Sequence, residues 1–204
     1  MKTIILSIFL ALLLVNNISY AEIQIPKQSK SQIKIDKAKK ALKKAHEVLS
    51  KDYKKYGVFH PKVAVDYNTI SEAYFTMGKY DESIEYALHA LKVEMKLQKE
   101  DDPKLAKLYY DTGNKYYMHK QHPTAILYMK KAVEIYTNGT NKDSLALADM
   151  YEGIASTFIN LMDYKKSLYY AEKCLDIRKK NLKKEDEPLQ RAYMNVNFLK
   201  KKNQ

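Results

Sequence analysis

The sequence predicts an all-α fold in which antiparallel helical hairpins stack side by side into a solenoid. Three stretches align without a gap at a spacing of 42 residues, beginning at Pro61, Pro103 and Leu145. A fixed period of this size is typical of repeat arrays, in which each unit buries its apolar face only against its neighbours. The composition agrees, because glycine and proline are rare, at five residues each, and 46% of the residues are hydrophobic. Such arrays present extended concave surfaces, which favours binding over catalysis.

The three stretches share small and aromatic residues at matched positions. Small side chains let two helices approach closely, and tyrosines supply the large apolar area that fills the space between hairpins. The matched sets are Ala64, Ala106 and Ala148; Tyr67, Tyr109 and Tyr151; Tyr74, Tyr116 and Phe158; Tyr86, Tyr128 and Tyr170; and Ala90, Ala132 and Cys174. We therefore interpret the tyrosines in register mainly as packing residues, with binding surface as the alternative.

The first 21 residues have the pattern of a secretory signal peptide. Lys2 is followed by an apolar run from Ile4 to Val15, and the small residues Ser19 and Ala21 occupy the positions that a signal peptidase reads. This run is short against the roughly 20 residues that a spanning helix needs, so cleavage after Ala21 is favoured over an uncleaved anchor. We expect a periplasmic or secreted protein without a transmembrane segment after cleavage. A flexible polar leader is expected over residues 22–32.

The rest of the chain divides into a capping helix, three hairpins and a closing helix. The amphipathic helix expected at 33–56 ends at Gly57 and resembles, in register, the second helix of a unit whose first helix is missing. The closing helix, at about 189–200, is expected to place Ala192 and Met194 on its inner side. The hairpin helices are expected at about 62–77 and 81–98, 104–119 and 123–137, and 144–161 and 164–182. The domains are a basic N-terminal capping helix (33–58), three repeats (59–102, 103–143 and 144–187), and a C-terminal capping helix with a tail (188–204).

The pattern within each unit resembles the tetratricopeptide repeat (TPR), and more narrowly its 42-residue variety in kinesin light chains. That variety opens with His-Pro-x-x-Ala and continues with Gly-x-Tyr, Ala-Ile and Ala-Leu. The first unit here has His60-Pro61-Lys62-Val63-Ala64, Gly78-Lys79-Tyr80, Ser83-Ile84 and Ala90-Leu91. The resemblance covers about residues 60–188 and implies a TPR-like superhelix of antiparallel helix hairpins. It departs from the pattern at Lys120 and Met162, where a turn glycine is expected, and at Leu145, where a proline is expected.

The resemblance further implies that the first helix of each hairpin lines a concave groove that binds a peptide or a partner protein. Asn68 and Asn114 are the most attractive positions, because an amide can pair with both the N–H and the C=O of an extended peptide. Acidic residues stand where one TPR subclass grips a C-terminal carboxylate, so a mixed or basic peptide is expected instead. A solvated helix face is the alternative for each residue. The predicted groove residues are Asn68, Glu72, Lys107, Tyr110, Asn114, Tyr117, Asp149 and Glu152.

Positive charge is concentrated before the repeats and marks a second candidate surface. Residues 22–62 contain twelve lysines and four acids, whereas residues 63–204 contain 23 basic and 20 acidic residues. An exported protein would meet anionic lipid, lipopolysaccharide or acidic polymers on this surface, whereas nucleic acid fits the charge but not the compartment. A solvated capping helix is the alternative, since the apolar face of the helix is mainly alanine and suits packing better than bilayer binding. The lysines concerned are Lys37, Lys40, Lys43, Lys44 and Lys51.

No motif for catalysis is found. The chain has no glycine-rich phosphate loop, no His-Glu-x-x-His and no nucleophile elbow, so we predict no enzyme activity, cofactor or metal site. The single cysteine, Cys174, cannot form a disulfide within the chain. It stands where the other units have Ala90 and Ala132, which predicts a small buried residue. An exposed thiol or an intermolecular disulfide is the alternative.

Overall fold

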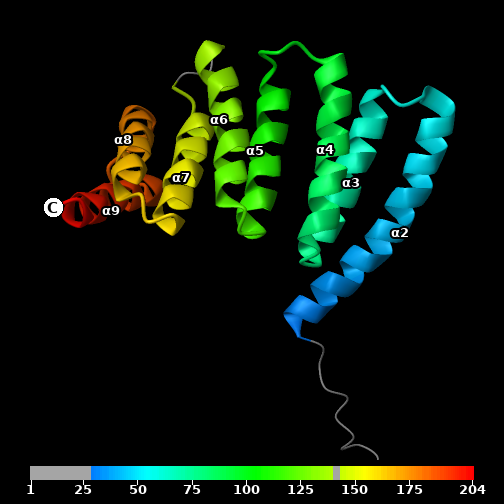
Figure 1. Ribbon diagram of the computed structural model, residues 1–204, viewed down its shortest axis with the longest axis horizontal. Coiled ribbons are helices and arrows are strands. Elements are labelled where there is room, and N and C mark those ends of the chain that lie inside the picture. The colour runs from blue at the N-terminus through cyan, green and yellow to red at the C-terminus, as the bar shows by residue number, and fades with distance from the viewer. Residues whose placement is uncertain (1–28, 140–142) are drawn as a thin grey trace, which may run out of the picture. The chain divides into compact units, whose positions relative to one another are not determined.

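The computed structural model describes residues 29–139 and 143–204, and this part of the chain contains eight helices and no strand. Residues 35–204 form one compact unit. Helix α2 (Lys30–Tyr56) precedes three hairpins, and α9 (Glu187–Lys202) follows them. The hairpins are α3 (Pro61–Thr76) with α4 (Tyr80–Leu97), α5 (Pro103–Met118) with α6 (His122–Asn138), and α7 (Leu145–Asn160) with α8 (Tyr164–Asn181) (Figure 1).

The predicted all-α solenoid is confirmed, and every helix end of the three hairpins lies within one residue of its expected position. The helix α2 begins earlier than predicted, at Lys30, so residues 30–32 are helical and do not belong to a flexible leader. The predicted signal peptide and leader residues 22–28 lie outside the described residues. No helix of the described part is long and apolar enough to span a membrane.

The first helix of each hairpin begins at a side-chain cap. The backbone N–H of Lys104 donates to the Asp102 carboxylate at 2.7 Å, and the His60 ring accepts in the same way from Lys62 at 3.3 Å. Proline occupies the first turn in both helices, where its missing N–H is not needed. The third repeat lacks this proline, but the Ser144 hydroxyl still accepts from the Leu147 N–H at 3.3 Å. The capping residue therefore keeps the start of α7 in register.

The turn inside each hairpin requires a left-handed residue, whether or not it is glycine. Gly78 has φ +73°, and the matched residues of the next two repeats, Lys120 and Met162, have φ +61° and +57°. Gly57, which ends α2, has φ +79°. Only glycine adopts this conformation without cost, and other residues incur about 1–2 kcal/mol. The two departures from the TPR pattern thus change the energy of the turn and leave its geometry unchanged.

Small residues bring the two helices of each hairpin into close contact. In the first repeat the hydroxyls of Ser71 and Ser83 each donate to the other residue's carbonyl, at 2.7 and 2.9 Å. The second repeat has Gly113 at the matched position, and a Cβ there would lie 3.1 Å from the Ala125 carbonyl oxygen. A larger side chain at these crossings would push the helices apart, which is why the register holds only Ser, Gly and Ala there.

Aromatic pairs recur in all three repeats, which confirms the packing role of these residues, but they lie between the two helices of each hairpin and not between hairpins as predicted. Their ring centroids lie 5.1 to 5.7 Å apart, within the range of favourable aromatic contacts. The pairs are Tyr74 with Tyr86, Tyr116 with Tyr128, and Phe158 with Tyr170. Cys174 is buried beside the third pair, and burial raises the pKa of its thiol to about 11. The cysteine is therefore a core residue, and the exposed-thiol alternative is wrong.

The two end helices cap the repeats in different ways. On α2, His46 makes edge contacts with Tyr74 and Tyr86, at centroid distances of 6.5 and 5.6 Å. On α9, Ala192 is buried with Leu189, Val196 and Leu199 against α8. The prediction that Met194 faces inward is wrong, because this side chain is 63% exposed. Two residues correspond to more than half a helical turn, so Met194 lies on the opposite side of α9 from Ala192.

Candidate functional site

A groove separates the first helices of repeats 1 and 2, α3 and α5, and encloses about 560 Å³. Five of the eight predicted groove residues line it: Asn68 and Glu72 from α3, and Lys107, Asn114 and Tyr117 from α5. Phe75, Asp111, Lys115 and Met118 complete the lining. The register that placed these residues on one face in the sequence therefore places them around one cavity in the structure.

Lys115 is a functional candidate that the sequence reasoning missed. It is only 3% exposed, and its Nζ donates to Glu72 Oε1 across the groove at 2.6 Å while lying 5.4 Å from the centroid of the Phe75 ring. The matched residues of the other repeats are Ala73 and Thr157, both buried. A lysine at a register position that is otherwise small and buried was the signal that could have identified it.

The two acids that line the groove both face a lysine. Glu72 pairs with Lys115, and Asp111 pairs with Lys107 at 2.6 Å. The acids of this groove are thus compensated, which reduces the repulsion of a carboxylate expected from the sequence. The amides of Asn68 and Asn114 and the rings of Phe75 and Tyr117 supply polar and apolar contacts beside these pairs.

The equivalent space between repeats 2 and 3 is filled by Tyr110. Its ring lies directly over Gly153 of α7, where an added Cβ would overlap the Tyr110 hydroxyl. The hydroxyl donates to the Asp149 carbonyl at 3.0 Å. Burial raises the pKa of Tyr110 to about 12, assisted by the nearby Asp149 charge and opposed by the Asn114 amide. The predicted groove residue Tyr110 therefore joins two repeats.

Asp149 and Glu152 are engaged at the junction between repeat 3 and α9. The buried Arg178 guanidinium donates to Asp149 Oδ1 and to Glu152 Oε2, each at 2.8 Å. Arg191 of α9 donates to the other Glu152 oxygen at 3.2 Å. Burial acts to raise the pKa of Glu152, but the hydrogen bonds from both arginines outweigh it and the pKa is lowered. Glu152 thus joins repeat 3 to α9, whereas Asp149 is bound by Arg178 within repeat 3. Neither arginine was identified from the sequence.

The five lysines predicted as an anionic-surface site are all exposed on α2. None of them forms an ion pair with another residue of the described part. Their charges are available to a ligand or to solvent. Within the described ranges, no group of three or more histidine, cysteine or acidic side chains is arranged to hold a metal ion.

The family model of the tetratricopeptide repeat matches residues 62–138. Residues 62–138 are tetratricopeptide repeats. They cover the first two hairpins of the TPR array and both walls of the groove between them. The third hairpin repeats the same helix lengths, turn conformation and aromatic pair. No curated protein sequence matches the chain.

Solved structures show the same fold at low sequence identity. TPR-like repeats of a putative kinesin light chain from Podosopora anserina superpose with a TM-score of 0.73 at 14% identity, covering 85% of this chain and 83% of that one. BtubC (BKLC) from P. vanneervenii gives 0.64 at 17% identity, with 86% and 85% covered. The apo form of RapI gives 0.70 at 18% identity, covering 85% of this chain and 47% of that one. The predicted likeness to kinesin-light-chain TPR repeats is confirmed at the level of the fold.

Proposed function

We propose that this protein is an exported, non-catalytic scaffold that binds an extended peptide segment of a partner protein in the groove between α3 and α5. The TPR fold supports a protein-interaction scaffold in general terms. The observation that carries the specific proposal is the open cavity between repeats 1 and 2, whose counterpart between repeats 2 and 3 is closed by Tyr110. Two asparagines, Asn68 and Asn114, line this cavity.

The lining of the groove suits a main chain with mixed side-chain charge. Asn68 and Asn114 can each donate to a peptide carbonyl and accept from a peptide N–H. Phe75 and Tyr117 supply apolar contact area. The pairs Glu72–Lys115 and Lys107–Asp111 allow either sign of peptide charge to find a partner. Charge-assisted hydrogen bonds of this kind add more than neutral ones, so a peptide carrying both signs is favoured.

The most direct test substitutes both amides and leaves the fold intact. Partners are first captured from an envelope extract at high salt, and the affinity of the captured partner is then measured by calorimetry. Asn68→Ala combined with Asn114→Ala is expected to weaken this affinity at least about tenfold, because each lost hydrogen bond removes about 1 kcal/mol. The matched control is Asn197→Ala, an exposed amide on α9. Equal affinity of the double variant and the control would reject the groove.

Export is the second part of the proposal and rests on the sequence of residues 1–21. Mass spectrometry of the protein recovered from cells that produce the full-length chain should give an N-terminus at Glu22. Recovery of the uncleaved chain from the cytoplasm would contradict export without affecting the groove.

A second candidate function is docking on an anionic envelope surface through α2. The observation that favours it is the exposure of Lys37, Lys40, Lys43, Lys44 and Lys51 without acidic partners in the described part. Binding to vesicles containing anionic lipid should then occur at low salt and disappear at high salt, since exposed charges are strongly screened. Charge reversal of Lys40, Lys43 and Lys44 should abolish it. A partner bound in the groove should instead remain bound at high salt, and its affinity should be unaffected by these substitutions.

A further inference from the structure

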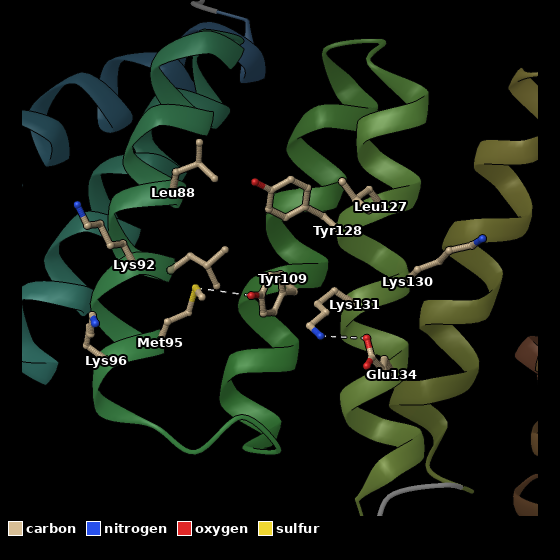
Figure 2. A pocket seen from close by; sticks show the side chains of 11 residues that line it. Leu88, Lys92, Met95, Lys96, Tyr109, Leu127, Tyr128, Lys130, Lys131 and Glu134 are labelled. Atoms are coloured by element: carbon tan, nitrogen blue, oxygen red, sulfur yellow. Dashed lines mark hydrogen bonds and ion pairs between the residues drawn. The ribbon is translucent and has the colours of Figure 1, made fainter.

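A second groove lies between the second helices of repeats 1 and 2, α4 and α6, and encloses about 620 Å³ (Figure 2). Its wall on α4 carries Leu88, Leu91 and Met95, and its wall on α6 carries Leu127 and Tyr128, with Tyr109 of α5 between them. The Tyr109 hydroxyl donates to Met95 Sδ at 3.6 Å, which holds the two side chains together. The groove is therefore mainly apolar, and it shares with the peptide groove proposed above only α5, through different residues.

Large apolar side chains in this groove are exposed to solvent. Met95 is 53% exposed and Leu127 is 67% exposed. An exposed apolar surface of this kind commonly marks an interaction site. Methionine is well suited to such a surface, because its flexible thioether adapts to different partners.

The next junction of the array shows that the fold does not require this apolar groove. Between α6 and α8, the residues that match Leu88, Met95 and Leu127 are Lys130, Thr137 and Tyr169. Tyr169 lies over Lys173 of its own helix, with the Nζ 5.0 Å from the ring centroid. The exposed aliphatic side chains Met95 and Leu127 are thus replaced by Thr137 and Tyr169 at the next junction.

Lysines surround the groove and give it a charge. Lys92, Lys96, Lys130 and Lys131 all line it, and Glu134 is the one acid of the lining, paired with Lys131 at 3.0 Å. The pKa of Lys131 is raised, mainly by its hydrogen bond to Glu134 and to a smaller extent by the negative charge of Glu100. In the described part of the chain, Lys92 and Lys96 have no ion-pair partner. An occupant with acidic groups would therefore be attracted.

We infer that this groove binds an acidic amphipathic helix of a partner protein. The α4 wall places Leu88, Leu91 and Met95 at helical spacings of three and four residues, so its apolar stripe is about two turns long. A partner helix with apolar residues at the same spacing can lay its apolar face along this stripe. Acidic residues beside that face then meet Lys92 and Lys96 on the α4 wall.

Other occupants of the groove fit the charge or the shape less well. A second copy of this chain is disfavoured because the protein carries a net charge of +12. The chain's own residues 22–32 contain two lysines and one glutamate, so they lack the acidic character that the lysines attract. A small apolar anion would satisfy one lysine but leave much of an open, two-turn surface uncovered. Sites for such ligands usually enclose most of the ligand.

The experiment is a selection of 12-residue peptides displayed on phage against the full chain, with counterselection against Leu127→Glu. We expect enriched peptides to be acidic and to carry apolar residues three or four positions apart. Fluorescence anisotropy then compares one enriched peptide across variants. Lys92→Glu with Lys96→Glu should weaken binding about tenfold, since two attractive pairs become repulsive. Lys183→Glu with Lys184→Glu, two exposed lysines between α8 and α9, is the control with the same charge change and should leave the affinity unchanged.

Each remaining outcome decides the inference or separates it from the function proposed above. No enrichment, or enrichment of basic peptides, would overturn it. Equal loss in the control Lys183→Glu with Lys184→Glu would show a general charge effect and would overturn it as well. Displacement of the peptide by dodecanoate at a higher affinity than the peptide itself would assign the groove to a small ligand instead. Asn68→Ala with Asn114→Ala should leave this binding intact, so the proposal for the peptide groove and the inference for this groove are tested separately.

Discussion

The junction between repeats 1 and 2 is open, whereas the junction between repeats 2 and 3 is filled, although both are built by the same backbone. Two matched positions make the difference. Repeat 1 places Asn68 where repeat 2 places Tyr110, and the facing residue is Asp111 at the first junction and Gly153 at the second. The Tyr110 ring over Gly153 fills the space at the second junction, whereas the smaller Asn68 and Asp111 side chains leave the space at the first junction open. Whether a junction of this array is open or filled thus depends on side chains at single register positions.

The second helices repeat the same contrast. The surface between α4 and α6 is apolar and rimmed by lysine, whereas the surface between α6 and α8 is polar and of mixed charge. Both open grooves therefore belong to the first junction. Repeat 3 and α9 instead use their polar residues internally, in the network around Arg178. The two proposed binding grooves therefore lie in the N-terminal half of the array, and the ion-pair network that joins its helices lies in the C-terminal half.

Opening the filled junction should have the largest effect. Tyr110→Asn removes the ring that packs on Gly153 and the hydrogen bond to the Asp149 carbonyl. We expect the free energy of unfolding to fall by about 2–3 kcal/mol, because a cavity replaces a half-buried aromatic side chain. Urea denaturation followed by circular dichroism measures it. The Asn160 amide donates to the Tyr117 hydroxyl at 2.9 Å, and Tyr117→Phe, which removes this hydrogen bond, should cost about 1 kcal/mol. An equal loss in both variants would show that Tyr110 does not fill the junction.

Breaking the ion pair of the open junction should cost somewhat less and depend on which partner is removed. Glu72→Ala leaves the buried Lys115 without its carboxylate, and we expect a loss of about 2 kcal/mol, discounted because Glu72 is half exposed. Lys115→Met has a similar volume and no charge to bury, so it should be near neutral. Thermal denaturation of both variants tests this order. The reverse order would mean that Lys115 stabilises the fold mainly through its charge and not through the packing of its buried aliphatic side chain.

Closing the open junction should abolish binding with little effect on stability. Asn68→Tyr combined with Asp111→Gly copies the filled junction into the first groove. The affinity for the partner captured through this groove should fall at least about tenfold, equivalent to about 1.4 kcal/mol, while the melting temperature changes little. Unchanged affinity in a folded double variant would exclude the cavity as the peptide site. Lys107 is exposed, so the loss of its partner Asp111 adds little to the change in stability.

The smallest effect is expected at the hairpin turns, where the first repeat has glycine and the others do not. Lys120→Gly and Met162→Gly remove the strain of a left-handed side-chain residue but add flexibility to the unfolded chain. Each should raise the free energy of unfolding by up to about 1 kcal/mol. The reciprocal Gly78→Ala should lower it by a similar amount. Stabilisation at only one of the two positions would show that, at the other, side-chain contacts outweigh the cost of the left-handed backbone conformation.

Helix positions and turns followed closely from the sequence, because they depend on short-range patterns. Apolar residues at helical spacing, caps such as Asp102 and breakers such as Gly78 act within a few residues of themselves. The side-chain orientation of Met194 was predicted wrongly, because Met194 lies two residues after the buried Ala192 and therefore on the opposite side of the helix. The groove residues of the first junction were also recovered, because register alone brings Asn68, Glu72, Lys107, Asn114 and Tyr117 to one face.

The sequence by itself determined the period, the helices and the burial of Cys174, since each follows from helical spacing or from positions that match between the repeats. Only the tertiary structure decided which groove positions are free. Whether Tyr110 projects into a groove or packs on Gly153 depends on a residue about one repeat away. The same holds for Glu72 with Lys115, and for Glu152 with Arg178 and Arg191. Contacts between repeats join side chains far apart in the chain, and no local pattern records which of them will meet.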